Sequence, residues 1–329
     1  MLATATPVTP PGWEEATGDL VRLVNRSGAA LAWLAPRYGA NLVGYAVRRP
    51  AGWQQVLYAA GPQALAARPT RYGCPVLCPF PGFVTGARYT WQGHGYTLPP
   101  NLPGGRGYAH GFAHTHSWRM TQSSVDTVTA ELATMTDLTP AAWAGYPFVL
   151  RLRLTARLVG QALVLELEAT NEGDSAAPVG LGLHPYFDPA ALGGTREQLR
   201  ACLPGQTERV LDDALPTGTT RPTTVGAVPL PPAGQTALVA RTDLGARPAA
   251  VLRGPAGAGS VTLTLEEGCR ELMLYAPAEQ PSVALEPLSC ALSAISRQAG
   301  APERLAALRP GGQRRLAVTI AIGPGEEED

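Results

Sequence analysis

The chain has 329 residues, a formal charge of zero and only 16% charged residues. No basic or acidic block precedes the acidic residues 326–329, so we expect neither a nucleic-acid nor a membrane partner. All 26 basic residues are arginine. This excludes Schiff-base aldolases, pyridoxal enzymes and P-loop proteins, because each of them needs a lysine amine.

The cysteine pattern and the N-terminus bear on the cellular compartment. The five cysteines form no zinc-type set of Cys-x-x-Cys pairs, and their odd number without a secretory segment favours reduced thiols; they are Cys74, Cys78, Cys202, Cys269 and Cys290. Residues 1–15 are too polar and proline-rich for a signal peptide, and no window approaches a membrane span. We therefore expect a cytoplasmic protein.

The first readable element is a short helix over residues 62–68, with Pro62 in its first turn and Pro69 after its end. Further along, three histidines fall within seven residues. Alternation in a strand would place His110, His114 and His116 on one face, which is a geometry that a metal can use. Gly111 beside His110 instead favours close approach to a ligand. We predict that His110 binds substrate, that the other two are surface histidines, and that no metal is bound.

Alternating strands dominate the rest of the chain. Apolar residues recur at every second position over residues 148–154 and 163–167, with a break at Gly160 that predicts a hairpin. The clearest strand, over residues 316–322, follows a turn at residues 310–312. The 37 glycines and 32 prolines fit a fold of many short strands, because the turns between strands favour these residues. We predict an all-β fold, a large antiparallel β-sandwich with few short helices, as one domain over residues 12–323 with loose termini at 1–11 and 324–329.

Two ionisable residues share an unusual setting. His184 and Glu286 each end an apolar, strand-like run and each precedes a proline. A residue before proline is pushed into an extended conformation, so both side chains should project from a sheet. At its ordinary pKa of about 4.3, Glu286 would be a carboxylate base at neutral pH, and at its ordinary pKa of about 6.5, His184 would be a partly protonated imidazole. The pair suits proton transfer on a small polar substrate.

An ordered set of motifs resembles the aldose 1-epimerases, or galactose mutarotases. The resemblance covers residues 18 to 323, and its motifs are Ala35-Pro36-Arg37-Tyr38-Gly39-Ala40-Asn41-Leu42, Gly73-Cys74-Pro75-Val76-Leu77-Cys78-Pro79, Gly86-Ala87-Arg88-Tyr89-Thr90-Trp91-Gln92-Gly93, His110-Gly111-Phe112 to Trp118, His184-Pro185-Tyr186-Phe187 and Leu285-Glu286-Pro287. The resemblance implies a large antiparallel sandwich with a sugar site in an open groove, and an isomerase that interconverts α and β anomers of a sugar without a cofactor.

The resemblance also implies roles for individual residues. Glu286 resembles the general base that takes the anomeric hydroxyl proton, and His184 the general acid that protonates the ring oxygen. His110 resembles a histidine that holds the sugar. Asp243 resembles, more loosely, a carboxylate that binds sugar hydroxyls. Arg71 resembles an arginine that holds the substrate in hexose-6-phosphate mutarotases of the same superfamily.

Two departures from the family pattern bear on the substrate. Phe83 stands where many members have a sugar-binding arginine, and His114 stands where the phosphosugar relatives read arginine. Because a phosphate dianion favours arginine over neutral imidazole, a free aldose is the leading hypothesis. A hexose 6-phosphate and a non-catalytic carbohydrate-binding role remain the alternatives. The sequence does not indicate the oligomeric state.

Overall fold

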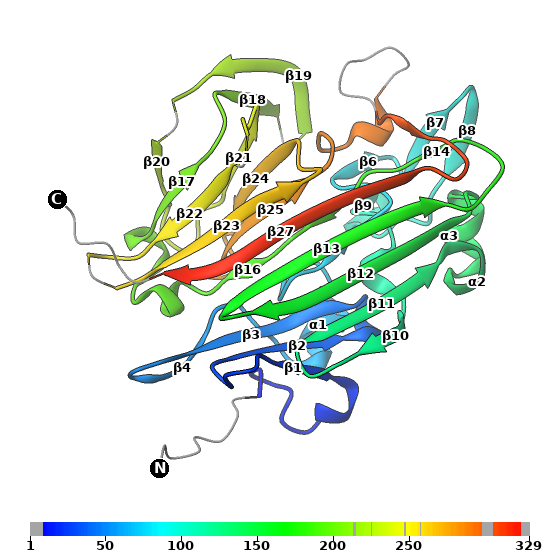
Figure 1. The fold of residues 1–329 in the computed structure, drawn as a ribbon. Helices are drawn as coiled ribbons and strands as arrows, with labels where there is room; N and C mark the ends of the chain where they lie inside the picture. Colours follow the sequence, from blue (N-terminus) through cyan, green and yellow to red (C-terminus); the bar gives the residue numbers. More distant parts are fainter. Residues whose placement is uncertain are drawn as a thin grey trace.

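The computed structural model describes residues 9–212, 215–224, 226–246, 248–256, 258–297 and 305–323. Most of the predicted loose termini, 1–11 and 324–329, lies outside this part of the chain. The described residues are arranged mainly in antiparallel sheets with short helices, as Figure 1 shows. The predicted all-β class with few short helices is confirmed.

The largest sheet has nine strands. Its alternating burial follows the leucine periodicity of the sequence, because one face packs inward and the other carries arginine and glutamate. In spatial order the strands are β10 (Arg119–Ser123), β11 (Thr127–Ala133), β12 (Leu150–Val159), β13 (Ala162–Asn171), β27 (Gln313–Gly323), β23 (Ser260–Glu267), β22 (Ala249–Arg253), β17 (Arg200–Leu203) and β20 (Gly226–Pro229). The predicted hairpin at Gly160 joins β12 to β13, and the predicted last strand is β27.

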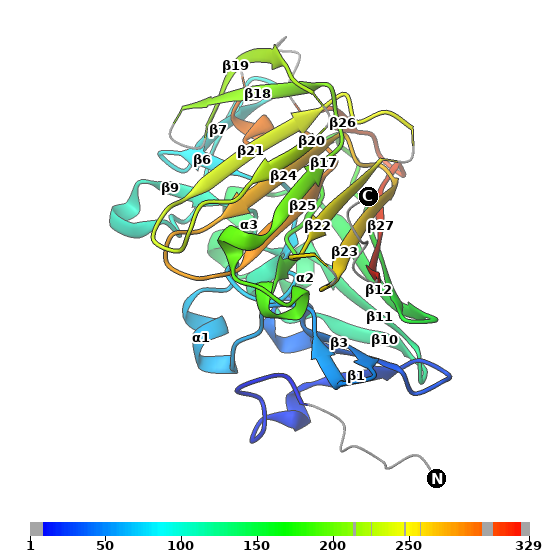
Figure 2. The same cartoon turned by 90° about the vertical axis from the view of Figure 1, so that its left-hand side faces the viewer.

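The second large sheet has eight strands and is less regular. Its main path is β19 (Leu215–Pro222), β18 (Thr207–Asp212), β21 (Ala237–Thr242), β24 (Glu271–Ala276), β25 (Val283–Leu288), β15 (Gly182–Leu183) and β5 (Val76–Leu77), with β16 (Tyr186–Phe187) also paired to β25. Figure 2 shows β18, β21 and β24 side by side, with α1 (Pro62–Ala67) below them. The predicted helix at residues 62–68 is thus confirmed.

Smaller elements complete the described structure. A four-stranded sheet contains β1 (Val21–Val24), β2 (Ala30–Ala35), β3 (Asn41–Arg49) and β4 (Gly52–Gln55). Three strand pairs are β6 (Phe83–Thr85) with β9 (Gly107–Ala109), β7 (Arg88–Trp91) with β8 (His94–Thr97), and β14 (Ala177–Pro178) with β26 (Ala307–Leu308). The helices besides α1 are α2 (Thr134–Asp137), α3 (Pro140–Gly145) and the 3₁₀ turns η1 (Thr17–Asp19), η2 (Pro36–Tyr38), η3 (Pro103–Gly105), η4 (Ala113–Thr115), η5 (Pro189–Leu192), η6 (Arg196–Gln198) and η7 (Ala294–Ser296).

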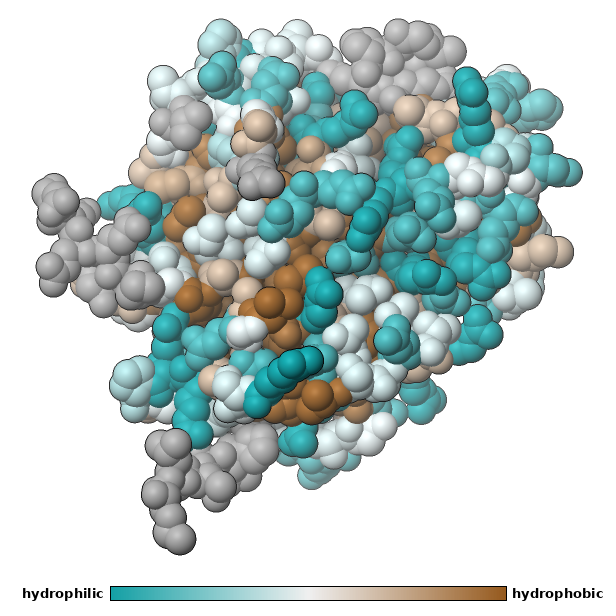
Figure 3. Space-filling view, viewed as in Figure 1, coloured by the Kyte–Doolittle hydropathy of each residue, from teal (hydrophilic) through white to brown (hydrophobic). Residues whose placement is uncertain are grey.

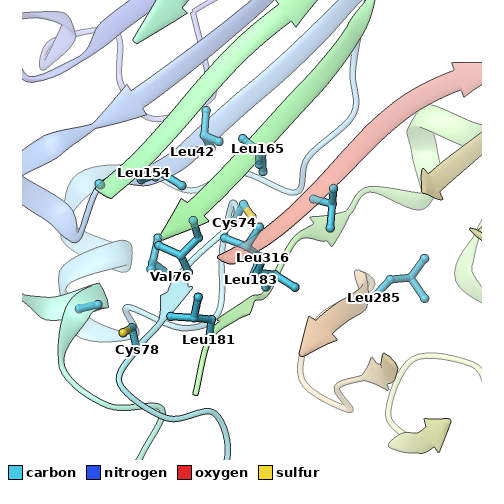
Figure 4. Close-up of a cluster of buried hydrophobic side chains, with 14 of the residues drawn as sticks. Leu42, Cys74, Val76, Cys78, Leu154, Leu165, Leu181, Leu183, Leu285 and Leu316 are labelled. Atoms are coloured by element: carbon cyan, nitrogen blue, oxygen red, sulfur yellow. The ribbon is translucent and has the colours of Figure 1, made fainter. Parts of the chain in front are cut away.

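One hydrophobic core joins the two large sheets. Leu154, Leu165 and Leu316 from the nine-stranded sheet belong to the same buried cluster as Leu183 and Leu285 from the eight-stranded sheet, as Figure 4 shows. The opposite face of β12, β13 and β27 is largely hydrophilic in Figure 3. A sandwich with this core holds the eight-stranded sheet in place, and that sheet carries the site.

No helix among the described residues is long and apolar enough to cross a membrane. The five cysteines are all free thiols, as predicted.

Candidate active site

A cavity of about 640 Å³ lies beside the eight-stranded sheet. Side chains from β21, β24 and β25 line it, together with the end of α1 and loop residues 101–103 and 109–110. Four of the five predicted site residues face this space: Arg71, His110, His184 and Glu286. Its volume falls within the range of small-molecule sites, about 300–1,000 Å³.

The strand register brings His184 and Glu286 together. β15 and β16 both pair with β25, through Gly182↔Leu288 and Tyr186↔Ala284. Counting inward from both pairs places His184 opposite Glu286. Residues directly opposite on antiparallel strands have Cβ atoms about 4.5–5.5 Å apart, so their side chains meet.

The prolines act differently on the two strands. Pro185 has no N–H to donate and separates β15 from β16, so that His184 lies in the gap and its own N–H donates to the carbonyl of Pro75 (3.0 Å). Glu286, in contrast, lies inside β25, which continues through Pro287. The expectation that both residues end a strand is therefore right for His184 and wrong for Glu286.

A glycine backs this arrangement. Gly73 has φ +67°, and its carbonyl accepts the N–H of Tyr186 at 2.8 Å. A Cβ on Gly73 would lie 2.3 Å from Oδ1 of Asn41, so a larger residue would displace the segment that supports β16.

The two side chains form a buried pair. Nε2 of His184 lies 3.3 Å from Oε1 of Glu286, and each side chain is only 4% exposed. The Tyr186 hydroxyl lies 3.3 Å from the same nitrogen, and the Tyr186 ring stacks on the imidazole at 4.5 Å. Within the described part of the chain, Nδ1 of His184 and Oε2 of Glu286 have no hydrogen-bond partner. Buried polar atoms without partners are rare and are typical of functional sites.

Burial changes the proton affinity of both groups. It raises the pKa of Glu286 from its usual 4.5 to about 8, against a smaller lowering by Arg71. It lowers the pKa of His184 well below 6.5, with further lowering by His110 and Arg71. The expectation of ordinary pKa values is therefore wrong, because both groups lose hydration that favours their charged forms. Both shifts favour the neutral forms, a protonated Glu286 carboxyl beside an uncharged His184 imidazole.

His110 adds a neutral hydrogen-bond donor. The backbone N–H of Gly82 donates to its Nδ1 (3.2 Å), so that nitrogen is unprotonated and Nε2 carries the hydrogen. The His110 ring lies 5.8 Å from the His184 ring, and burial lowers the pKa of His110 to about 4. The φ of His110 is +62°, which is uncommon outside glycine. Backbone outliers of this kind cluster at functional sites.

Arg71 lies on another side of the cavity and is already engaged. Its guanidinium forms an ion pair with Glu279 at 3.1 Å, donates to the Tyr275 hydroxyl and lies 5.4 Å from the centre of the Tyr275 ring. The backbone carbonyl of Arg71 accepts a hydrogen bond from Gln280 (2.9 Å). These contacts hold a polar, partly exposed group at the cavity edge.

Comparisons with known proteins identify the family of this chain. A sequence profile described as aldose 1-epimerase matches residues 20–321. The chain belongs to the aldose 1-epimerase family. The uncharacterized protein YihR of Escherichia coli (strain K12) is 33% identical over 113 residues, which span 34% of this chain and 35% of YihR. The alignment thus covers about a third of that relative.

Solved structures of other aldose 1-epimerase relatives share the fold. The GalM/aldose epimerase homologue from C. elegans has a TM-score of 0.78 and 16% identity, covering 93% of this chain and 99% of the other. Galactose 1-epimerase from Lactobacillus acidophilus NCFM has a TM-score of 0.70 and 17% identity, covering 93% and 95%. At such identities the likeness concerns the fold, and it confirms the predicted galactose mutarotase-like sandwich.

One predicted site residue lies elsewhere. Asp243 follows the end of β21, has φ +54° and is exposed, and it does not line the cavity. Its flanking residues gave little signal. The prediction that Asp243 binds the sugar is not supported by its position.

The histidine group also differs from the prediction. His114 is buried and lines the cavity, and burial lowers its pKa to about 3. It is therefore not a surface histidine, whereas His116 is partly exposed and its Nδ1 contacts the Phe112 carbonyl at 2.9 Å. The three are not aligned on one strand, because β9 ends at Ala109 and a 3₁₀ turn follows. No three His, Cys, Asp or Glu side chains in the described residues are grouped as metal ligands.

Sequence reasoning missed several cavity residues of this family member. Tyr275 and Met273 lie on β24, next to the strand of Glu286, and Glu279 follows in the loop. The apolar run over residues 272–276 is readable as a buried strand. Only the register shows that Met273 stands opposite Glu286, and no local pattern could have indicated it.

Proposed function

We propose that this protein interconverts the α and β anomers of a free hexose by opening and closing its ring. The observation that carries the proposal is the buried contact between His184 and Glu286, 3.3 Å apart at a cavity of sugar-binding size. Ring opening needs one group to accept the proton of O1 and another to donate a proton to O5. A pair that holds one proton supplies both functions.

The proton inventory gives the order of steps. Before the sugar binds, Glu286 carries the proton that the pair exchanges, because burial raises the pKa of that carboxyl. A hydroxyl of the bound sugar that donates to Glu286 favours its ionised form, and the proton then passes across the 3.3 Å contact to His184. Glu286 next accepts the O1 proton while His184 protonates O5, and the C1–O5 bond breaks.

The open-chain intermediate leaves the pair as it was in the empty site, with Glu286 protonated and His184 neutral. Rotation about the C1–C2 bond presents the other face of the aldehyde. His184 then takes back the proton from the hydroxyl at C5, and Glu286 returns its proton to the new O1. No cofactor enters these steps. Each well-placed acid or base contributes about 10²–10⁴ in rate.

Three further residues have supporting roles in this proposal. The Nε2–H of His110 donates to a sugar oxygen near His184, since the His110 ring is held 5.8 Å away and is neutral. Arg71 and Tyr275 present donors to hydroxyls at the edge of the cavity. The related galactose 1-epimerase of Lactobacillus acidophilus is consistent with a hexose substrate.

A free sugar fits this cavity better than a phosphorylated one. Glu279 already neutralises Arg71, and burial lowers the pKa of His114 to about 3, so that His114 is neutral at pH 7. A phosphate dianion needs cationic partners such as bidentate arginine. The alternative of a hexose-6-phosphate mutarotase would require Arg71 to leave Glu279, or Arg68, which also lines the cavity, to hold the phosphate.

The experiment is polarimetry of freshly dissolved α-D-galactose, α-D-glucose and α-D-glucose 6-phosphate, with and without enzyme. We expect acceleration over the spontaneous rate for at least one free hexose, and less for the phosphate. Sugar binding to Glu286→Gln, measured by calorimetry, helps to distinguish the catalytic proposal from the non-catalytic, carbohydrate-binding alternative. Binding without acceleration by the wild type would support a carbohydrate-binding protein and would contradict the proposal.

A further inference from the structure

The cavity has one side that offers no hydrogen bonds. We call this the apolar wall; it consists of Phe83, Leu238, Met273 and Leu292. Met273 stands opposite Glu286 in the β24–β25 ladder, and on the next strand Ala240 stands opposite Met273. The ionisable side chain of Glu286 and the apolar side chain of Met273 are therefore only one strand spacing apart, about 4.8 Å.

The apolar wall is continuous around the catalytic pair. Leu292 and Leu238 pack in the same small cluster as Met273. Phe83 is fixed beside Leu292, because its backbone N–H donates to the hydroxyl of Ser293 at 2.9 Å. The Phe83 ring then lies 5.5 Å from the His110 ring. One apolar surface thus runs from Glu286 to His110.

The amide of Asn101 is already engaged in backbone hydrogen bonds. Asn101 lines the cavity, but its amide oxygen accepts the N–H of Ala109 (2.8 Å) and its amide nitrogen donates to the Ala109 carbonyl (3.1 Å). Both amide atoms are used to hold β9 in place. A sugar hydroxyl that faced the apolar wall would lose water without gaining a partner.

The proposed chemistry indicates which part of the sugar meets this surface. If His184 acts at O5, as proposed above, then C6 branches from C5, the carbon bonded to that oxygen. Tyr275, a ring 6.2 Å from His184, lies on β24 across β25 from His184, whereas His110 lies on the opposite side, next to the Cys78–Gly111 bridge. The His110 ring is 5.8 Å from His184, and the Phe83 ring is 5.5 Å from His110. The exocyclic carbon of a hexose would therefore lie near the Phe83 end of the apolar wall.

We propose that the preferred substrate is a 6-deoxyhexose, whose C6 methyl group packs against Phe83. This inference rests on the proposed function. A methyl group gains from contact with apolar surface, whereas a hydroxymethyl group leaves its hydroxyl unpaired. One unpaired buried hydroxyl costs about five- to a hundred-fold in binding, which sets the size of the expected preference.

The test compares sugars that differ only at C6. Anomer exchange is measured by NMR as kcat/KM for D-fucose against D-galactose, and for 6-deoxy-D-glucose against D-glucose. We expect the 6-deoxy sugar to be favoured at least about fivefold in one pair. Acceleration with the parent hexose equal or favoured in both pairs would overturn this inference alone. No acceleration of any of the four sugars would overturn the proposed function and, with it, this inference.

Two variants test the role of Phe83 itself. Phe83→Asn places an amide at that end of the wall, and we expect the 6-deoxy preference to fall toward parity through a change in KM. Phe83→Leu keeps the surface apolar and is the matched control, with the preference retained. An unchanged preference in Phe83→Asn would contradict the assignment of C6 to this side chain, and the wild-type comparison stands even if a variant fails to fold.

Discussion

The two large sheets are built under different constraints. In the nine-stranded sheet, β12 and β13 pair without interruption from Leu150↔Asn171 to Val159↔Ala162, and their ionisable side chains lie on the outer face. In the eight-stranded sheet, β5, β15 and β16 contain two residues each, and His184 and Glu286 are buried. The first sheet is paired regularly, whereas Pro185 interrupts the second and leaves His184 in the gap beside Glu286.

The same contrast holds for charge. Glu166 on β13 forms ion pairs with Arg315 and Arg157 at the surface, where water screens them. Glu286 has no such partner within hydrogen-bonding distance other than His184 among the described residues, and burial raises its pKa to about 8. Two glutamates in the same sandwich therefore differ in their partners, and burial raises the pKa of Glu286, because their environments differ.

The largest expected effect is on catalysis. His184→Asn removes the acid while keeping a polar group of similar size, and we expect kcat to fall about 10²–10⁴-fold with sugar binding retained. His116→Asn is the matched control, because His116 does not line this cavity. Polarimetry of both variants measures the effect. Equal rates in the two variants would remove His184 from the mechanism.

Next in size is a change in the regular sheet. Leu165 is fully buried on β13, in the core between the sheets. Leu165→Ala should lower the free energy of unfolding by about 2–5 kcal/mol, because it leaves a cavity in that core. Urea denaturation measures this loss, and kcat of the folded fraction should stay unchanged. A large fall in kcat at full folding would mean that the two sheets are not functionally separate.

A third prediction concerns pH. The folded pKa of Glu286 is raised to about 8 from its usual 4.5, so the folded protein keeps a proton that the unfolded chain releases. The stability from this group is present at low pH and is lost as pH rises from about 4.5 through 8, by up to about 1.4 kcal/mol per pH unit.

The opposing shift of His184 affects stability only toward acid. Its lowered pKa means that the unfolded chain gains a proton below about pH 6.5 that the folded protein does not bind. Urea denaturation of wild type and Glu286→Gln between pH 6.5 and 8 therefore isolates Glu286. We expect the variant to gain stability relative to wild type as pH rises, and a pH-independent difference would show that Glu286 is already ionised in the folded protein.

The smallest effect is expected on the outer face. Glu166→Gln removes exposed ion pairs with two arginines, and such pairs contribute about 0–1 kcal/mol. Thermal or urea denaturation should show a change within that range. A loss well above it would mean that the arginine and glutamate side chains of this face act as a cooperative network.

Local patterns in the sequence predicted the regular sheet well. The alternation of apolar residues over 148–154 and 163–167 is a direct consequence of one buried face, so β12, β13 and their hairpin could be predicted. His184 and Glu286 could be singled out because each precedes a proline in an apolar run. That they face each other follows from the register of two strands far apart in the sequence.

The remaining site residues depended on the conformation of loops. The exposure of Asp243 and the burial of His114 follow from a left-handed residue after β21 and from a 3₁₀ turn after β9, and neither feature has a clear sequence signal. The raised pKa of Glu286 could not be predicted either, because it comes from burial by surrounding strands. Arg71 was placed at the site by motif resemblance, whereas its ion pair with Glu279 needed the structure.

The most direct test of the central claim compares one glutamate from each sheet. Anomer exchange of a sugar that the wild type accelerates is measured by NMR saturation transfer for Glu286→Gln and Glu166→Gln at pH 7. We predict that Glu286→Gln loses at least about a hundredfold in rate and that Glu166→Gln keeps the wild-type rate. A folded Glu286→Gln protein that exchanges the anomers as fast as Glu166→Gln would contradict the assignment of the His184–Glu286 pair as the catalytic centre.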